Sequence, residues 1–170
     1  MIIRPLRADD VARLAAFARW TYVEAFGASF APGDLEPYLR ESLSDEYFRT
    51  AVQDDDFLLA EEAGSLLGFV QFGTVANGGG QELRRLYVHP EFQNRGIGSQ
   101  LLDAALAHPR LASVPVLFID VWEHNRGARA LYERYGFAVV GARLFVSASG
   151  DTTGRDLIME RRKPPAAADP

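Results

Sequence analysis

Residues 93–99 of this chain read Gln93-Asn94-Arg95-Gly96-Ile97-Gly98-Ser99, and the elements on either side of them set the architecture that we expect. A strand-like run precedes them at Glu82–Val88, and a helical pattern begins at Ile97. The two glycines let the backbone approach a ligand closely, and the first N–H groups of a helix point outward with the positive end of its dipole. The segment therefore predicts an anion-binding turn, although a tight strand-to-helix turn would carry the same pattern.

Two familiar nucleotide-binding signatures are absent from this turn. A Walker A loop would end in Gly-Lys followed by Ser or Thr, and a Rossmann fingerprint would need a third glycine and a downstream acidic residue. A nucleotide-phosphate binder is therefore disfavoured. The turn is distinguished by the segments that frame it in the sequence, which are Leu86-Tyr87-Val88-His89-Pro90 before it and Asn125, Ala128, Leu131-Tyr132 and Gly136-Phe137 after the next strand.

The rest of the chain alternates between strand-like and helical patterns. Before the turn we expect strands at residues 2–4, 57–61 and 67–72, and helices from about residue 9 to 26 and from 36 to 52. After it we expect a helix from residue 97, a strand at 114–121, a helix at 128–135 and closing strands at 139–140 and 156–159. A strand, a crossover helix and a second strand imply a parallel pair inside an otherwise antiparallel sheet. The expected fold class is therefore α/β, with an α+β mixed sheet.

Length and composition limit the classes of function that are open to this chain. The 170 residues suit one domain, which we expect to span residues 1–163 and to be followed by a flexible C-terminal tail at 164–170. The net charge of -5 and the pI near 5.2 argue against the broad basic surface that nucleic-acid binding needs. With no cysteine and only three scattered histidines, we expect no metal. No apolar run reaches the length of a signal sequence or membrane span, so we expect no membrane partner and a cytoplasmic location.

Two ordered motifs resemble those of the GNAT superfamily of acyl-CoA-dependent N-acetyltransferases. The family signature Gln/Arg-x-x-Gly-x-Gly/Ala matches Gln93, Gly96 and Gly98, and the later Asn-x-x-Ala-x-x-Leu-Tyr-x-x-x-Gly-Phe stretch matches Asn125–Phe137 without a gap. The resemblance covers nearly the whole chain and is strongest over residues 82–137. It implies the GNAT fold, a mostly antiparallel sheet with a central splayed parallel pair flanked by helices. It also implies an acetyl-CoA-dependent acetyltransferase that acts on a primary amine by direct attack.

The resemblance implies a site for acetyl-CoA as co-substrate. In the family the backbone amides of the turn hold the pyrophosphate, which implicates residues 93–99 here, with Arg95 adding charge. The family's third strand carries a bulge and splays from its parallel neighbour, so that the pantetheine arm would pair with the backbone of Leu86, Tyr87 and Val88. Apolar and polar residues fail to alternate at these three positions, which fits a bulge there but also fits a strand end buried on both faces. Asn125, which we expect to cap a helix, would also contact the pantetheine region.

Two residues are expected to move protons in the reaction that the resemblance implies. Tyr132 matches a family tyrosine near the thioester sulfur, where it would contact acetyl-CoA and protonate the departing thiolate or donate a hydrogen bond to it. A phenol, with a pKa of about 10, would not lose its own proton beforehand, since a thiol titrates at about 8.5. Glu82, at the start of the third strand, would take the proton of the amine directly or through water. The alternatives are a core tyrosine and a solvated edge carboxylate.

The sequence defines the acceptor less closely. Several flanking segments resemble the PaiA-like branch, which includes spermidine and spermine acetyltransferases: Phe26-Gly27, Asp34, Trp122-Glu123 and Asp156-Leu157-Ile158-Met159. Further acidic residues could attract a polycation or could be ordinary surface charge: Glu24, Asp34, Glu36 and Asp54-Asp55-Asp56. We therefore predict a small-molecule amine acceptor, with a polyamine first. A protein or peptide N-terminus, an aminoglycoside and an amino acid stay open, as do a non-catalytic acyl-CoA sensor and a homodimer.

Overall fold

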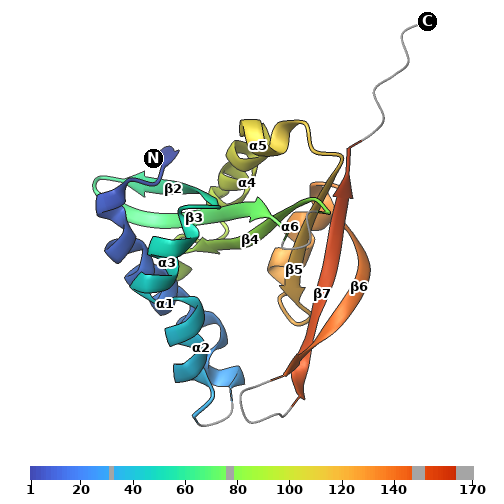
Figure 1. Ribbon diagram of the computed structural model, residues 1–170, viewed down its shortest axis with the longest axis horizontal. Coiled ribbons are helices and arrows are strands. Elements are labelled where there is room, and N and C mark those ends of the chain that lie inside the picture. Colours follow the sequence, from blue (N-terminus) through green and yellow to red (C-terminus); the bar gives the residue numbers. More distant parts are fainter. Residues whose placement is uncertain (31–32, 76–78, 147–151, 164–170) are drawn as a thin grey trace, which may run out of the picture.

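The structure is a computed structural model that describes residues 1–30, 33–75, 79–146 and 152–163. The tail predicted at residues 164–170 lies outside the described residues. Figure 1 shows a sheet whose early strands run across the view and whose late strands turn steeply away from them.

The described residues form one sheet of seven strands in the order β1-β2-β3-β4-β5-β7-β6. The only parallel neighbours in this sheet are β4 and β5, and every other neighbouring pair is antiparallel. This arrangement confirms the predicted mixed sheet and its central parallel pair. The strand bounds are Ile2–Pro5 (β1), Asp56–Glu62 (β2), Ser65–Thr74 (β3), Gln81–Val88 (β4), Val116–Trp122 (β5), Ala138–Val146 (β6) and Thr152–Arg162 (β7).

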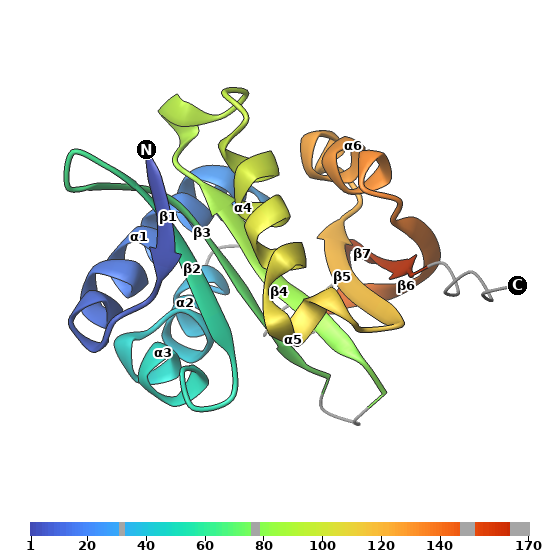
Figure 2. The same ribbon diagram turned by 90° about the horizontal axis from the view of Figure 1, so that it is seen from above.

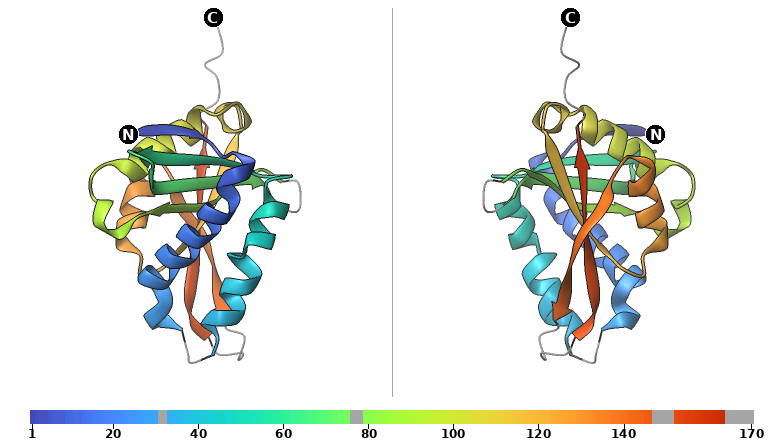
Figure 3. Two further views of the ribbon diagram at one scale, coloured as in Figure 1. Left: turned by 90° about the vertical axis from the view of Figure 1, so that its left-hand side faces the viewer. Right: turned by 90° about the vertical axis from the view of Figure 1, so that its right-hand side faces the viewer.

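Helices cover both faces of the sheet, α1–α3 on one face and α4–α6 on the other (Figures 2 and 3). Each set buries its own apolar cluster, with Leu14, Phe48 and Phe69 at the centre of the first and Leu101, Leu102 and Phe72 in the second. Of the helices that the described residues form, none is long and apolar enough to cross a membrane. Their bounds are Val11–Phe26 (α1), Leu35–Ser42 (α2), Asp45–Ala51 (α3), Ile97–Ala107 (α4), Pro109–Ala112 (α5) and Arg126–Arg134 (α6).

The single helix predicted for residues 36–52 is wrong, because the segment forms two helices with a break at Leu43 and Ser44. Ser44 has extended backbone angles, and its hydroxyl accepts a hydrogen bond of 3.1 Å from the backbone N–H of Tyr47. A serine in this position satisfies one of the free N–H groups at a helix start, and the acidic Asp45 and Glu46 that follow suit the positive end of the helix dipole. Local capping therefore outweighs the continuous apolar pattern.

Strand β4 carries a bulge, but not where the sequence predicts it. Gln71 of β3 pairs with Arg85 and Phe72 pairs with Leu83, which leaves Arg84 as the extra residue. The predicted bulge at Leu86-Tyr87-Val88 is therefore wrong, since all three residues keep regular partners on β3. Both arginines at the bulge reach the side of the sheet where α3 packs: Arg84 Nε donates to Asp55 at 2.8 Å and Arg85 Nη1 donates to the Tyr47 hydroxyl at 2.6 Å.

The parallel pair is short and then splays. Pairing between β4 and β5 covers Gln81 to Leu83 on one strand and Leu117 to Ile119 on the other, and it ends there. From Arg84 onward the β5-facing edge of β4 has no strand partner among the described residues. Unpaired strand edges present free N–H and C=O groups, so this opening between two central strands is a place where a ligand can pair with the sheet.

Candidate active site

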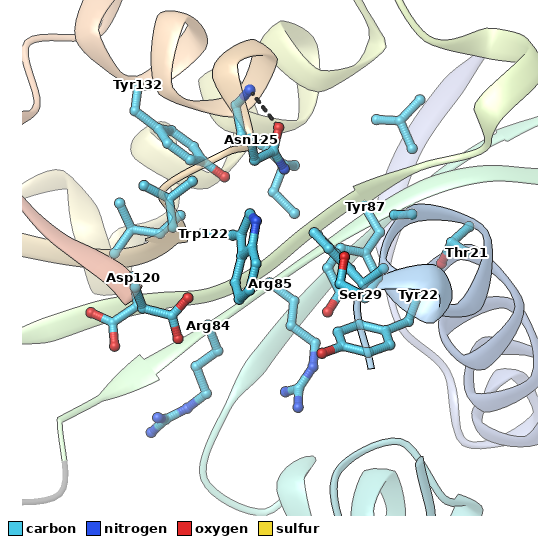
Figure 4. Close-up of a pocket in the computed structure, with 18 of the residues that line it drawn as sticks. Thr21, Tyr22, Ser29, Arg84, Arg85, Tyr87, Asp120, Trp122, Asn125 and Tyr132 are labelled. Carbon is cyan, nitrogen blue, oxygen red and sulfur yellow. Dashed lines mark hydrogen bonds between the residues drawn. The ribbon is translucent and has the colours of Figure 1, made fainter. Parts of the chain in front are cut away.

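A cavity of about 430 Å³ opens where β4 and β5 separate. Its walls come from strands β4, β5 and β7 and from aromatic side chains of α1 and α2 (Figure 4). Asn125, Ala128 and Tyr132, at the start of α6 and along it, complete the lining. The cavity therefore joins the two halves of the sheet, and its lining combines charged groups with phenol and indole rings. Such a concave site with a few convergent polar groups is the usual setting for binding a small molecule.

Three carboxyl groups line this cavity: Glu82 from β4, Asp120 from β5 and Asp156 from β7. Burial raises the pKa of each of them. Arg84, whose Nη1 lies 2.9 Å from Glu82, opposes the rise at Glu82, and Arg143, 3.0 Å from Asp120, opposes it at Asp120. The charge of Asp120 adds to the rise at both Glu82 and Asp156. This wall is suited to a cation and to accepting a proton.

Tyr132 lies on α6 with only 4% of its surface exposed, and its ring packs against Phe137. Its hydroxyl has no hydrogen-bond partner among the described residues and faces the cavity (Figure 4). Burial raises the pKa of Tyr132, so the phenol keeps its proton at neutral pH. A buried hydroxyl that borders a cavity and lacks a protein partner is available to donate to a bound molecule.

Asn125 starts the helix that carries Tyr132. Its side-chain Oδ1 accepts a hydrogen bond of 3.1 Å from the backbone N–H of Ala128, which confirms the predicted cap and is drawn as a dashed line in Figure 4. Asn125 and Ala128 also line the cavity, so the start of α6 borders the site. The cap fixes the orientation of α6 and, through it, the position of the Tyr132 ring.

The predicted anion-binding turn leads from β4 into α4. Asn94 and Gly96 have left-handed backbone angles, with φ of 59° and 81°, and α4 begins at Ile97 with no side chain capping it. Within the described part of the chain, none of the six backbone N–H groups from Asn94 to Ser99 has an acceptor. Successive free N–H groups at a helix start form a concave site for phosphate-like anions. The structure therefore brings together the groups that such a site requires.

The side chains of the turn are placed around its free backbone. Gln93 lines the cavity and its Nε2 donates to the carbonyl oxygen of Val88 at 3.2 Å, which ties the turn to the end of β4. Arg95 is exposed, with its guanidinium 5.1 Å from the centre of the Phe92 ring. Ile97 is buried in the core, and Gly98 would meet Leu131 of α6 at an ordinary contact distance if it carried a Cβ.

The sequence reasoning missed two of the three cavity carboxylates. Asp120 and Asp156 line the site, whereas none of the acidic residues expected to attract a polycation does so: Glu24, Asp34, Glu36 and Asp54-Asp55-Asp56. One signal was available, because Asp120 interrupts an otherwise apolar strand, Val116–Val121. A charged residue inside such a run is uncommon unless it is paired or functional. Asp156 stood out only as part of the PaiA-like segment at residues 156–159, and the pairing of β7 with β5 is what places it at the cavity.

Comparison with known proteins decides the family. The family model described as Acetyltransferase (GNAT) family matches residues 18–137, which is more than half of the chain. The chain belongs to the GNAT family of acetyltransferases. Spermidine N(1)-acetyltransferase of Thermoplasma acidophilum is 30% identical over 166 residues, covering 94% of this chain and 96% of that relative. The protein is accordingly an N-acetyltransferase.

Solved structures share the fold. The PaiA N-acetyltransferase of Thermoplasma acidophilum in complex with coenzyme A has a TM-score of 0.74 and 24% identity, covering 95% of this chain and 98% of that one. The yncA protein of Salmonella typhimurium with its cofactor acetyl-CoA has a TM-score of 0.68 and 21% identity, covering 99% and 98%. Together with the spermidine acetyltransferase relative, the first of these supports the predicted PaiA-like branch of the GNAT family.

The raised pKa of Glu82 leads to a stability prediction. Because the folded-state pKa lies above the value of about 4.3 in an unfolded chain, the folded protein binds more protons between these two values, and the free energy of unfolding falls as pH rises through that window. Glu82→Gln removes this carboxyl, so the variant should lose less stability on raising the pH than the parent. Urea unfolding over a pH series measures the difference.

Glu24→Gln, which removes one exposed carboxyl from α1, is the control for the change in net charge. If the pH dependence of Glu82→Gln ran parallel to that of the parent, burial would not be holding Glu82 in its protonated form.

Proposed function

We propose that this enzyme transfers an acetyl group from acetyl-CoA to a primary amine of a small cationic acceptor. The observation that carries the proposal is the separation of β4 from β5, because one cavity then borders the start of α6, the Tyr132 hydroxyl and three carboxyl groups. The anion-binding turn adjoins this cavity through Gln93. This arrangement supports a site for a long phosphorylated thioester next to a site for an amine.

The free backbone groups around the cavity fit acetyl-CoA. The N–H groups of residues 94–99 suit its pyrophosphate, and the unpaired edge of β4 at Leu86-Tyr87-Val88 suits the amides of its pantetheine arm. Relatives in fold are known with coenzyme A and with acetyl-CoA bound, which supports the same assignment here. Acetyl-CoA supplies the acetyl group as a reactive thioester.

We expect Gly96→Asp to weaken binding of acetyl-CoA at least tenfold. The new carboxylate would stand beside the free N–H groups of the turn, where it would repel the pyrophosphate, and a φ of 81° disfavours any side chain. Gly64→Asp is a matched control, because Gly64 has the same φ of 81° but lies in the turn between β2 and β3, and an added Cβ meets no atom closer than 3.8 Å at either glycine. Calorimetric titration with acetyl-CoA measures both. Equal affinity in the two variants would contradict the assignment of the turn.

The proposed reaction needs a proton acceptor and a proton donor. The amine nitrogen bonds to the acetyl carbon as the carbon–sulfur bond breaks, the nitrogen gives up a proton and the sulfur receives one. Glu82, directly or through water, is our candidate for the first transfer, since burial brings its pKa closer to neutral and makes it a better base. Tyr132 is our candidate for the second, since its proton is retained until a thiolate forms.

We expect Tyr132→Phe to lower kcat by roughly 10²–10⁴, the usual range for loss of a general acid, with little change in affinity for acetyl-CoA. Only the hydroxyl is lost, and the ring still packs against Phe137. Tyr135→Phe is the control, because its hydroxyl bonds Asp103 and the Ser99 carbonyl instead of facing the cavity. Steady-state rates of thiol release, under conditions where chemistry limits turnover, measure both variants. An unaltered kcat would assign Tyr132 to the core.

The acceptor that we propose carries more than one amine, as the polyamines do. Three carboxyl groups line the cavity, and a cationic substrate gains attraction from each one that is ionised. The likeness to a spermidine N(1)-acetyltransferase supports the same choice. The net charge of -5 favours the approach of a cation to this enzyme.

Spermidine should be acetylated with a higher kcat/KM than alanine or a neutral peptide N-terminus, and the preference should shrink as salt is added. Screening weakens the attraction between the cavity carboxylates and the polycation but has little effect on a neutral peptide, whose only charge is on the reacting amine. Alanine carries a carboxylate that the cavity carboxylates repel, so screening this repulsion also reduces the preference. Initial rates with the three acceptors at low and high ionic strength test this. A peptide that is preferred at both would replace the polyamine by protein N-termini and leave the acetyl-CoA site in place.

A further inference from the structure

The charges around the acceptor cavity are not all paired within the protein. Five charged residues line it: Glu82, Arg84, Arg85, Asp120 and Asp156. Arg84 forms ion pairs with Glu82 and with Asp55, and Asp120 forms one with Arg143. Among the described residues Arg85 and Asp156 have no ion-pair partner. One cation and one anion are thus left for a ligand.

Arg85 is held by neutral oxygens alone. Its Nη1 donates to the Tyr47 hydroxyl at 2.6 Å and to Gln71 Oε1 at 2.7 Å, and its Nη2 donates to the Ser42 carbonyl at 2.9 Å. The guanidinium lies 4.7 Å from the centre of the Tyr47 ring, and its Nε is buried without an acceptor. These contacts fix the position of the guanidinium, leave its charge without a counter-ion and leave one Nη2 hydrogen for a ligand.

A half-buried guanidinium without a carboxylate is costly, because burial removes the water that would otherwise solvate the charge. The remedy that proteins most often use is a carboxylate or a phosphate, which a guanidinium binds through paired, charge-assisted hydrogen bonds. The neighbouring Arg84 follows this rule with two carboxylates, Glu82 and Asp55. Arg85 departs from the rule at a position where it lines a cavity.

Asp156, on the β7 wall of the cavity, is a carboxyl group without an ion-pair partner among the described residues. It lies on β7 beside the cross-strand partner Trp122 of β5, and both side chains line the cavity. Burial raises the pKa of Asp156 and the charge of Asp120 raises it further, while the charge of Arg143, its cross-strand partner on β6, opposes the rise without forming an ion pair. An ammonium group between these two carboxylates would favour their ionised forms. Figure 4 shows Asp120 and Arg85 coming from different strands on different sides of the cavity.

We infer that the acceptor carries a carboxylate in addition to its amines, with an ammonium group held by the carboxyl wall and the carboxylate held by Arg85. This inference rests on the proposed function of the cavity. Glu82 and Arg85 lie three positions apart on β4 with the bulge at Arg84 between them, so the strand separates them by at most about 10 Å. The reacting amine and the carboxylate therefore lie several bonds apart, as in the side-chain amine of a basic amino acid.

Ornithine and putrescine provide a matched pair of probes, because they differ only by one carboxylate. With the wild-type enzyme we expect kcat/KM for ornithine to exceed that for putrescine by about tenfold or more, mainly through KM, as a charge-assisted pair implies. Equal values, or a preference for putrescine, would overturn the inference. That result would leave the proposed function standing, whereas a failure to acetylate ornithine, putrescine and spermidine alike would contradict the proposed function itself.

Arg85→Gln tests the residue. We expect the KM for ornithine to rise about tenfold and the KM for putrescine to fall, because the variant loses the attraction for the carboxylate and also the repulsion of a second ammonium. Tyr47→Phe removes a neutral partner of Arg85 and keeps the charge, so it should shift both acceptors in the same direction. If Arg85→Gln also shifted the KM values of both acceptors in the same direction, the role of Arg85 would be structural and the inference would be overturned.

Arg85→Lys provides a second variant in case Arg85→Gln does not fold, because it preserves the charge that packs against Tyr47. It should retain a preference for ornithine, because the lysine ammonium keeps the charge that attracts the carboxylate. A folded Arg85→Lys enzyme that prefers putrescine to ornithine would overturn the assignment of the carboxylate to Arg85.

Discussion

The early end of the pairing between the parallel strands β4 and β5 determines the arrangement of the site in this structure. β4 and β5 are joined only from Gln81 to Leu83 and from Leu117 to Ile119, and beyond those residues each strand keeps only its antiparallel partner. Because a sheet interior normally satisfies both edges of every strand, ending the pairing early exposes backbone groups in the middle of the molecule. The cavity, the free edge of β4 and the approach of α6 all lie at this opening.

The bulge at Arg84 is anchored by a buried polar network. Asp55, at the end of the α3–β2 connection, accepts from Gln71 Nε2 at 2.7 Å and from Arg84 Nε at 2.8 Å. Its other oxygen is buried without a partner and lies so close to Gly73 that a Cβ there would come within 1.8 Å. The network therefore fixes the position of Arg84, the extra residue of the bulge. Arg84 Nη1 in turn donates a hydrogen bond to Glu82 in the cavity, which restricts the position of that carboxyl group. The Arg84 guanidinium thus connects the buried network around Asp55 with Glu82 in the cavity.

The electrostatics of the cavity follow from the same topology. Three strands that are distant in sequence each contribute one carboxyl group. Burial raises the pKa of all three, and the charge of Asp120 adds to the rise at Glu82 and Asp156. The bulge turns Arg85 toward phenol rings and neutral oxygens instead of a carboxylate. The result is a site with acidic groups along β5 and β7 and a cationic group toward α2 and α3. A dipolar distribution of this kind selects for the charge pattern of a ligand as well as for its net charge.

Local sequence determined much of this protein. The glycines of residues 93–99, the asparagine that caps α6 and the alternating apolar patterns act over a few residues, so the turn, the helix start and most strands could be predicted without a structure. The break at Ser44 was also encoded locally, although the longer apolar pattern obscured it. Tertiary structure alone decided the remainder. The position of the bulge depends on the register against β3, the meeting of Glu82 with Asp120 and Asp156 depends on strand order, and the unpaired state of Arg85 depends on which side chains surround it. These features arise from contacts between residues far apart in the chain, and no periodicity within a single segment encodes them.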